Sequence, residues 1–267
     1  MKIHTTDRQW EKFGQIDPYY GVVSHEKYRG RQLETSVSEA FSRSGEVHID
    51  EVVRTIQTHF ATPARWRRAM DFGCGVGRLA LPLAHHCDEV VGVDVSPSML
   101  KIAEEDRNRL GLGNVKFVLG DDQLSRCDGD FDLIHSYIVF QHIHPSRGMA
   151  IFRQMLQRLR PGGIGVCHFT YDRHRSVRKL SQYAKASIPF ANAAINLVRG
   201  RRLDAPHMQM HRYDLGRLHR LIQTSATDQV FSHFTDHGGE LGVVFYFRRS
   251  TPAVSDIASE ASDKIPA

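Results

Sequence analysis

The stretch DFGCGVG, residues 71–77, places a glycine at every second position from Gly73 to Gly77. It follows RRAM and precedes RLALPLAHHC, so it lies where a strand is expected to pass into a helix. Because glycine has no Cβ, a ligand can approach the backbone of such a loop closely. The loop therefore predicts either a nucleotide-binding turn or a tight structural turn, and the flanking segments decide between them.

Strand-like and helical patterns alternate on the C-terminal side of this loop. Five short, largely apolar runs are expected to be strands, at residues 67–73, 89–95, 115–120, 131–140 and 164–171. Helical patterns are expected between them, at residues 77–87, 96–110 and 146–160. Apolar strands separated by helices are typical of a parallel sheet covered on both faces. The sequence thus predicts a doubly wound α/β fold.

The remaining segments are expected to cap or complete this core. We predict an N-terminal helical cap, the α/β core, a basic insertion that covers the substrate, a last helix with a β-hairpin, and a disordered tail. These parts are assigned to residues 1–62, 63–172, 173–213, 214–249 and 250–267, respectively. In the first part, Ser44 is expected to be the N-cap of a helix that ends before Pro63. In the fourth part, Gly238 and Gly239 are expected to form the hairpin turn.

Composition excludes several classes of protein. No apolar run approaches the ~20 residues that a membrane-spanning helix needs, and the N-terminus has no signal-peptide pattern. The four cysteines are scattered without CxxC spacing, which is typical of reduced thiols rather than a zinc site. His207 and His211 have i, i+4 spacing, but no carboxylate pattern accompanies them. We therefore expect a cytoplasmic protein without a bound metal.

Acidic residues after the second and third expected strands favour a nucleotide. Asp94 lies beside the glycine loop, where a carboxylate can accept hydrogen bonds from both hydroxyls of a ribose. Asp121 or Asp122 falls at the next position along the sheet edge, where it could accept a hydrogen bond from an adenine amino group. A dinucleotide is disfavoured, because Arg78 stands where that motif needs a glycine.

Five segments together resemble the class I S-adenosylmethionine-dependent methyltransferases. They are MDFGCGVGRLALPLA, VVGVDVSPSMLKIA, VKFVLGDDQ, FDLIHSYIVFQHI and LRPGG, in that order. The resemblance covers residues 66–171, and the last helix and hairpin extend it to residue 249. It implies a seven-stranded Rossmann-like sheet with an antiparallel last strand, and S-adenosylmethionine as methyl donor.

The resemblance also implies which residues bind that cofactor. They are Asp71, Gly73, Cys74, Gly75, Asp94, Val95, Met99, Asp121, Asp122 and Ser136. The glycine loop and Asp71 would hold the methionine end, with Ser136 nearby, and Asp94 would hold the ribose. The adenine would pack on Val95 and Met99, and its amino group would donate a hydrogen bond to Asp121, assisted by Asp122.

The methyl acceptor is less well defined by the sequence. The segment HSYIVFQHI stands where methyltransferases acting on base or glutamine nitrogen carry (D/N)PP(Y/F), so those acceptors are disfavoured. His142 is the candidate general base, because plant-type O-methyltransferases have a catalytic histidine in a similar place and histidine titrates near neutrality. His142 could instead cap a turn or pack on the cofactor. Other candidates near the acceptor are His144, Arg147, His168 and Tyr171.

The caps are expected to decide which acceptor binds. Tyr19 and Tyr20 could cover the cofactor, and residues 173–220 carry eleven Lys and Arg against two Asp. This basic segment fits an anionic partner or a solvated surface. Residues 187–202 could instead contact an anionic membrane, which we do not favour. We expect a methyltransferase that acts on a small molecule, with oxygen as the favoured acceptor atom. That acceptor could be anionic or lipid-like. An RNA or protein methyltransferase and a non-catalytic cofactor-binding scaffold are the alternatives; without an aromatic and basic alternation, nucleic acid is not favoured.

Overall fold

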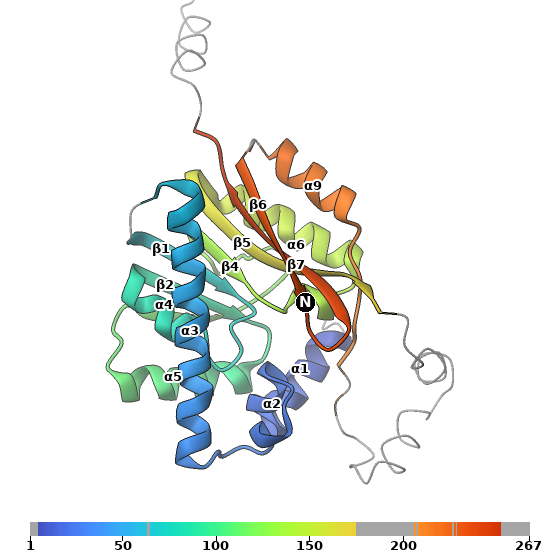
Figure 1. The fold of residues 1–267 in the computed structure, drawn as a ribbon. Coiled ribbons are helices and arrows are strands. Elements are labelled where there is room, and N and C mark those ends of the chain that lie inside the picture. Colours follow the sequence, from blue (N-terminus) through green and yellow to red (C-terminus); the bar gives the residue numbers. More distant parts are fainter. Residues whose placement is uncertain are drawn as a thin grey trace, which may run out of the picture.

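The computed structural model describes residues 5–62, 65–174, 206, 208–225, 227 and 229–251. In this part of the chain the strands form a seven-stranded sheet, in the order β3-β2-β1-β4-β5-β7-β6 (Figure 1). They are β1 (Trp66–Phe72), β2 (Cys87–Asp94), β3 (Val115–Leu119), β4 (Phe131–Ser136), β5 (Leu159–Arg173), β6 (Gln229–Asp236) and β7 (Glu240–Arg248). Strands β1 to β5 are parallel, and β7 runs antiparallel to β5 and β6. The predicted doubly wound sheet with an antiparallel last strand is confirmed.

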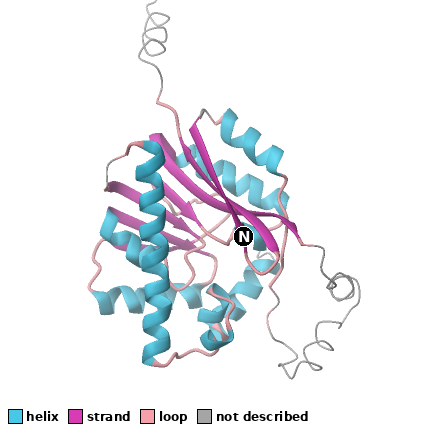
Figure 2. Ribbon diagram, viewed as in Figure 1, coloured by secondary structure: helices cyan, strands magenta, loops and turns pink. Residues whose placement is uncertain are grey.

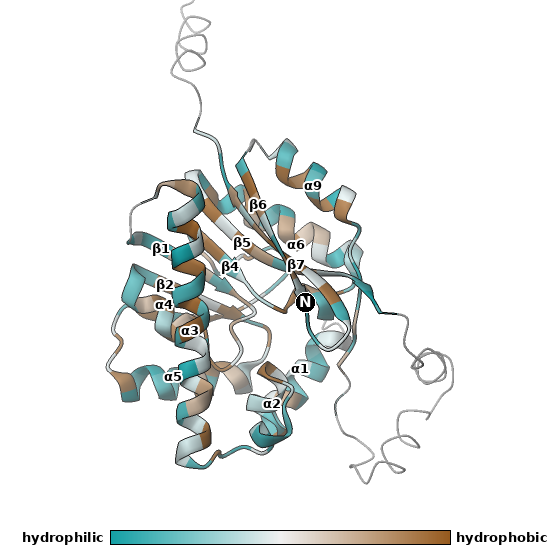
Figure 3. Cartoon of the chain, viewed as in Figure 1, coloured by the Kyte–Doolittle hydropathy of each residue, from teal (hydrophilic) through white to brown (hydrophobic). Residues whose placement is uncertain are grey.

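Helices cover both faces of this sheet (Figure 2). They are α1 (Thr5–Ile16), α2 (Pro18–Val22), η1 (Glu26–Tyr28), α3 (Thr35–Phe60), α4 (Ala80–Leu83), η2 (Ala84–His86), α5 (Pro97–Leu110), η3 (Phe140–His142), α6 (Pro145–Arg158) and α9 (Leu215–Thr224). One buried apolar cluster joins α3 and α4 to the sheet, and a second joins α6 and α9 to it. Hydrophobic and hydrophilic residues alternate along the helices that cover the sheet (Figure 3). Among the described residues, no helix is long and apolar enough to cross a membrane.

Helix α3 begins earlier than the sequence suggested. Its expected apolar side chains are buried, with Ile56 fully so, but the helix starts at Thr35 and not after Ser44. Ser44 lies inside the helix and its hydroxyl donates to the carbonyl of Phe41 at 2.6 Å. The N-cap prediction was wrong because Phe41 is itself buried, which extends the apolar face by more than a turn.

Two further elements are shorter than expected. The helix expected at residues 77–87 is reduced to α4 and the 3₁₀ turn η2. The strand expected at residues 131–140 ends at Ser136, and Ile138 then adopts φ 59°. A positive φ is an outlier for a β-branched residue and is retained only where the surroundings demand it. Here the chain turns so that Val139 packs over the glycine loop.

The turns predicted around α5 and the hairpin are confirmed. The Ser96 hydroxyl accepts a hydrogen bond from the Met99 N–H, and Gly111 ends α5 in the left-handed region. Gly238 and Gly239 both have positive φ between β6 and β7. Most of the expected basic insertion, the tail from residue 252 and Pro63 lie outside the described residues. The boundaries of the five expected parts stay predictions.

Candidate functional site

A cavity of about 720 Å³ follows the carboxyl ends of the parallel strands. Its walls come from the residues after β3, β2, β1 and β4, from the β6–β7 turn, and from the N-terminal segment. In a doubly wound sheet the loops after the strands converge at this edge, which is where ligands bind. The volume lies within the ~300–1,000 Å³ typical of small-molecule sites.

The glycine loop forms one wall of this cavity. Gly73 and Gly75 both have positive φ, at 75° and 54°. A Cβ on Gly73 would lie 2.4 Å from Cγ2 of Val139, and one on Gly75 would lie 2.7 Å from Cγ2 of Val22. Both positions therefore require glycine, for backbone conformation and for space, and the loop backbone faces the cavity directly.

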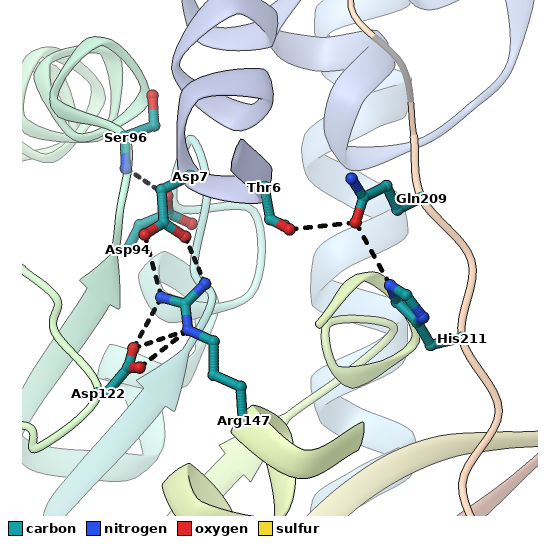
Figure 4. A network of polar contacts seen from close by, with 8 residues as sticks. All are labelled: Thr6, Asp7, Asp94, Ser96, Asp122, Arg147, Gln209 and His211. Atoms are coloured by element: carbon teal, nitrogen blue, oxygen red, sulfur yellow. Dashed lines mark hydrogen bonds and ion pairs between the residues drawn. The ribbon is translucent and has the colours of Figure 1, made fainter. Parts of the chain in front are cut away.

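Asp94 ties the end of β2 to the glycine loop. Its Oδ2 accepts a hydrogen bond from the N–H of Gly75 at 2.9 Å. Its Oδ1 accepts one from the N–H of Ser96, also at 2.9 Å (Figure 4). Burial raises the pKa of this carboxyl to about 6, although hydrogen bonds from the backbone N–H groups of Ser96, Gly75 and Val95 oppose that shift. Asp94 lines the cavity, so its carboxylate is preoriented for a further donor such as a ribose hydroxyl.

Asp121 and Asp122 also line the cavity, but each carboxylate has partners within the protein. Asp121 accepts hydrogen bonds from the N–H groups of Gln123 and Ser125, both at 3.0 Å. Asp122 forms an ion pair with Arg147 at 2.7 Å. Arg147 also pairs with Asp7 of α1 at 2.7 Å, so these three residues connect the N-terminal helix to the core (Figure 4).

The other residues expected at the cofactor divide into two groups. Cys74, Val95 and Met99 line the cavity. Burial keeps the pKa of the Cys74 thiol well above its usual range, so it stays protonated. Ser136 does not line the cavity: it is 1% exposed and its hydroxyl donates to the Phe72 carbonyl, joining β4 to β1. The strand ends there, and Tyr137 is the next residue to face the cavity.

Two buried polar atoms at the glycine loop have no partner among the described residues. One Asp71 oxygen, Oδ1, lies 2.8 Å from Nδ1 of His135, whereas Oδ2 is buried without a hydrogen bond. Among the described residues the Nε of Arg78 is likewise buried without a hydrogen-bond partner, and Nη1 of the same guanidinium donates to the Ser44 hydroxyl at 3.3 Å. Both side chains line the cavity. Buried polar groups are rarely left unpaired. Asp71 Oδ2 can therefore accept a hydrogen bond from a cationic group of a ligand, and Arg78 Nε can donate one to an anionic group. The α-ammonium and α-carboxylate groups of an amino acid are such a pair.

His142 lines the cavity, but both of its ring nitrogens have partners. Nδ1 lies 2.8 Å from the Gln209 carbonyl and must donate to it. Nε2 lies 3.1 Å from the Gln141 side-chain nitrogen. Since Thr170 donates to the oxygen of the same Gln141 amide, the amide nitrogen is the end that faces His142. Burial lowers the pKa of His142 to about 4. The ring is thus neutral and its lone pair is occupied; a catalytic role stays a prediction.

The remaining acceptor candidates are arranged differently. Arg147 is held in its ion pairs, and His144 is exposed. His168 is buried and its Nε2 lies 3.0 Å from the Thr235 hydroxyl. Tyr171 does not line the cavity. Among the described residues, no three His, Cys, Asp or Glu side chains gather as metal ligands, and His207 lies outside that range.

Sequence reasoning missed how the N-terminal segment closes the cavity. Tyr19 and Tyr20 do not line it; Tyr19 packs on Phe41 instead. Glu11 of α1 accepts hydrogen bonds from the Ser96 hydroxyl at 2.7 Å and from Ser98 at the start of α5. A carboxylate at a helix N-terminus is favourable because it meets unpaired N–H groups. No local pattern in α1 could have indicated this partner, because it is more than eighty residues away.

Comparisons with known proteins agree with this architecture. Residues 69–163 match the family model described as a methyltransferase domain. A demethylmenaquinone methyltransferase of Geobacillus kaustophilus is 34% identical over 105 residues, which cover 38% of this chain and 44% of that protein. A ubiquinone biosynthesis O-methyltransferase of Cereibacter sphaeroides is 28% identical over 105 residues, covering 39% of this chain and 42% of that protein. This chain therefore matches less than half the length of these curated relatives.

A solved structure extends the likeness beyond the matched domain. Magnesium protoporphyrin IX methyltransferase from Synechocystis, determined with bound S-adenosylhomocysteine, superimposes with a TM-score of 0.60. The alignment covers 92% of this chain and 100% of that chain at 16% sequence identity. At this identity the likeness shows the fold alone.

Proposed function

We propose that the chain is a class I S-adenosylmethionine-dependent methyltransferase that transfers a methyl group to a small molecule, because residues 69–163 match a methyltransferase-domain model and the fold is that of such an enzyme. The observation that carries the proposal is the pair of unpartnered buried atoms at the glycine loop. Asp71 Oδ2 suits an α-ammonium group, and Arg78 Nε suits an α-carboxylate. A nicotinamide dinucleotide has neither group.

The remaining cofactor contacts are proposed from the same cavity. Asp94 accepts the ribose hydroxyls, and Val95 and Met99 pack on the adenine. Asp121 has hydrogen-bond partners of its own, so we propose that it receives the adenine amino group only through its remaining oxygen lone pair. Bound S-adenosylmethionine supplies an electrophilic methyl group on a sulfonium sulfur. The chain contributes mainly by positioning, because such a methyl group is already reactive.

We further propose that the acceptor is a small molecule methylated at oxygen. A cavity of about 720 Å³ that Trp10 of α1 and the β6–β7 turn help to enclose supports a small molecule over a polymer. The curated relatives' names refer to demethylmenaquinone and to ubiquinone biosynthesis, which supports a planar acceptor but gives no single acceptor atom. An anionic or lipid-like acceptor stays a prediction, since most of the basic segment lies outside the described residues.

The cofactor assignment is tested by comparing two ligands on the Arg78→Gln variant. S-adenosylhomocysteine carries the amino-acid group, and methylthioadenosine has the same nucleoside without it. Losing a charge-assisted hydrogen bond costs about 1.5–3 kcal/mol, so the variant should bind S-adenosylhomocysteine roughly 10- to 100-fold more weakly. Its affinity for methylthioadenosine should stay within about twofold of wild type. Isothermal titration calorimetry measures both.

Arg67→Gln is the matched control, because Arg67 is exposed and outside the cavity. Equal weakening of both ligands by Arg78→Gln would refute the carboxylate contact. Absence of S-adenosylhomocysteine binding to the wild type would refute the proposed function as a whole. Binding without methyl transfer to any acceptor in a hydroxylated-compound screen would favour the non-catalytic scaffold.

A further inference from the structure

Four aromatic side chains meet at one end of the cavity, and we call them the Tyr137 cluster. Its members are His48 of α3, Tyr137 after β4, His168 of β5 and His237 in the β6–β7 turn. The Tyr137 ring lies 4.2 Å from His48 and 5.3 Å from His168, and the His168 ring lies 5.3 Å from His237. Tyr137 and His237 line the cavity, with the other two rings packed behind them.

The order of strands assigns this cluster to the end of the cavity opposite the nucleoside. The walls formed after β3, β2 and β1 hold Asp121, Asp94 and the glycine loop, which the proposed function gives to the cofactor. Tyr137 follows β4, on the other side of β1, and His237 belongs to the hairpin beyond β5. What remains for the methyl acceptor is the space at the Tyr137 cluster.

We propose that this end of the cavity binds an acceptor with a phenolic hydroxyl, and that Tyr137 and His237 are the hydrogen-bond partners of that hydroxyl. The inference rests on the proposed function and adds to it the class of acceptor and the group that receives its proton. The Tyr137 hydroxyl lies 3.4 Å from Nε2 of His237, at the long limit of a hydrogen bond. A ligand hydroxyl that contacts both atoms replaces this weak contact with two ordinary ones.

The protonation states of the pair suit a proton transfer from the acceptor. Burial raises the pKa of Tyr137, so its hydroxyl stays a donor near neutrality. Burial lowers the pKa of His237, so its ring is neutral there. In the step, the acceptor's O–H bond breaks, its electron pair stays on oxygen, and the proton moves to Nε2. Asp236 favours the resulting imidazolium, while His168 faces it as a neutral ring; Asp236 itself lies 3.5 Å from His174.

Because His237 is a weak base, its pKa bears on which kind of hydroxyl group it can deprotonate. A phenol with a pKa near 10 lies about 3.5 units above an ordinary histidine, whereas water, near 15.7, lies about 9 units above it. The lowered pKa of His237 widens both gaps equally. General-base catalysis follows Brønsted behaviour, so a smaller gap makes the proton transfer easier. An aliphatic alcohol resembles water in this respect, so the smaller gap favours a phenol over an alkyl alcohol. The flat rings of Tyr28, Tyr137 and His237 on the cavity wall also suit a planar ligand.

A phenol whose ionised form absorbs visible light tests this directly, and we choose 4-nitrophenol. The full chain is saturated with S-adenosylhomocysteine, and the ionisation of the bound probe is followed by absorbance against pH. The wild type should lower the apparent pKa of the bound probe by roughly one unit or more relative to free solution. His237→Gln should abolish that shift, and Tyr137→Phe should reduce it. His233→Gln, an exposed histidine on β6, is the control and should match the wild type.

Three results would overturn the inference. The wild-type complex does not bind 4-nitrophenol, or His237→Gln retains the full shift, or His142→Gln removes the shift while His237→Gln does not. The last result would make His142 the base. Affinity for S-adenosylhomocysteine, measured on each variant, reports folding and separates the two claims. A wild type that fails to bind it refutes the proposed function, whereas binding without the probe refutes only the phenol subsite.

Discussion

The carboxylate of Asp94 has two roles. It orders the glycine loop through the N–H of Gly75, and it faces the cavity where we propose the ribose. Burial raises its pKa to about 6, so its ionised form is costly in the folded chain. The pKa of Asp94 is higher in the folded chain than the ordinary value of 3.8, so the folded chain holds this proton more tightly. The free energy of unfolding therefore falls as the pH rises from about 4 to 6. The ionised Asp94 carboxylate thus lowers the stability of the fold but provides a charged hydrogen-bond acceptor in the cavity.

This predicts that cofactor affinity depends on pH. S-adenosylhomocysteine should bind with constant affinity above pH 7 and up to about tenfold more weakly per pH unit below about pH 6, because a protonated Asp94 has lost an acceptor. Asp121 should not contribute, since its backbone and Ser125 hydrogen bonds outweigh burial and lower its pKa. Calorimetric titrations from pH 5 to 8 measure the slope. A slope that persists in Asp94→Asn would assign it to another group.

Among the secondary-structure elements, helix α3 packs against the end of the glycine loop. Its Gly45 is buried, and a Cβ there would lie 2.1 Å from the Arg78 carbonyl oxygen. The helix therefore approaches the loop more closely than any side chain permits. The sequence pattern predicted the buried face of α3 from spacing alone. It could not predict the start of the helix or this contact, because both depend on packing against segments distant in the chain.

Gly45→Ala should destabilise the fold, against the usual trend. Alanine in a helix interior is normally favoured over glycine by about 0.5–1 kcal/mol. Here the added methyl group clashes with a backbone carbonyl, which cannot rotate as a side chain could. We therefore expect a loss of about 1–3 kcal/mol in the free energy of unfolding. Urea unfolding measures it, with the exposed α3 position Ser42→Ala as the control. A neutral or stabilising effect of Gly45→Ala would show that α3 is free to shift.

For the whole molecule, the features that the sequence predicts well are those with local causes. Alternating strands and helices, the Ser96 cap and the glycine loop each depend on a few neighbouring residues, and each is present. The site is less predictable, because its chemistry arises where distant segments meet. Ser136 was expected in the cavity but joins two strands, whereas Tyr137 beside it faces the cavity. The contact of Tyr137 with His237 joins residues a hundred positions apart.

The central claim is that this cavity binds S-adenosylmethionine through an amino-acid group at Asp71 and Arg78. Calorimetric titration of the full chain with S-adenosylhomocysteine, and in parallel with NAD, tests it most directly. We predict saturable binding of one S-adenosylhomocysteine per chain and no measurable binding of NAD. Binding of NAD in preference to S-adenosylhomocysteine would contradict the account from the glycine loop outward.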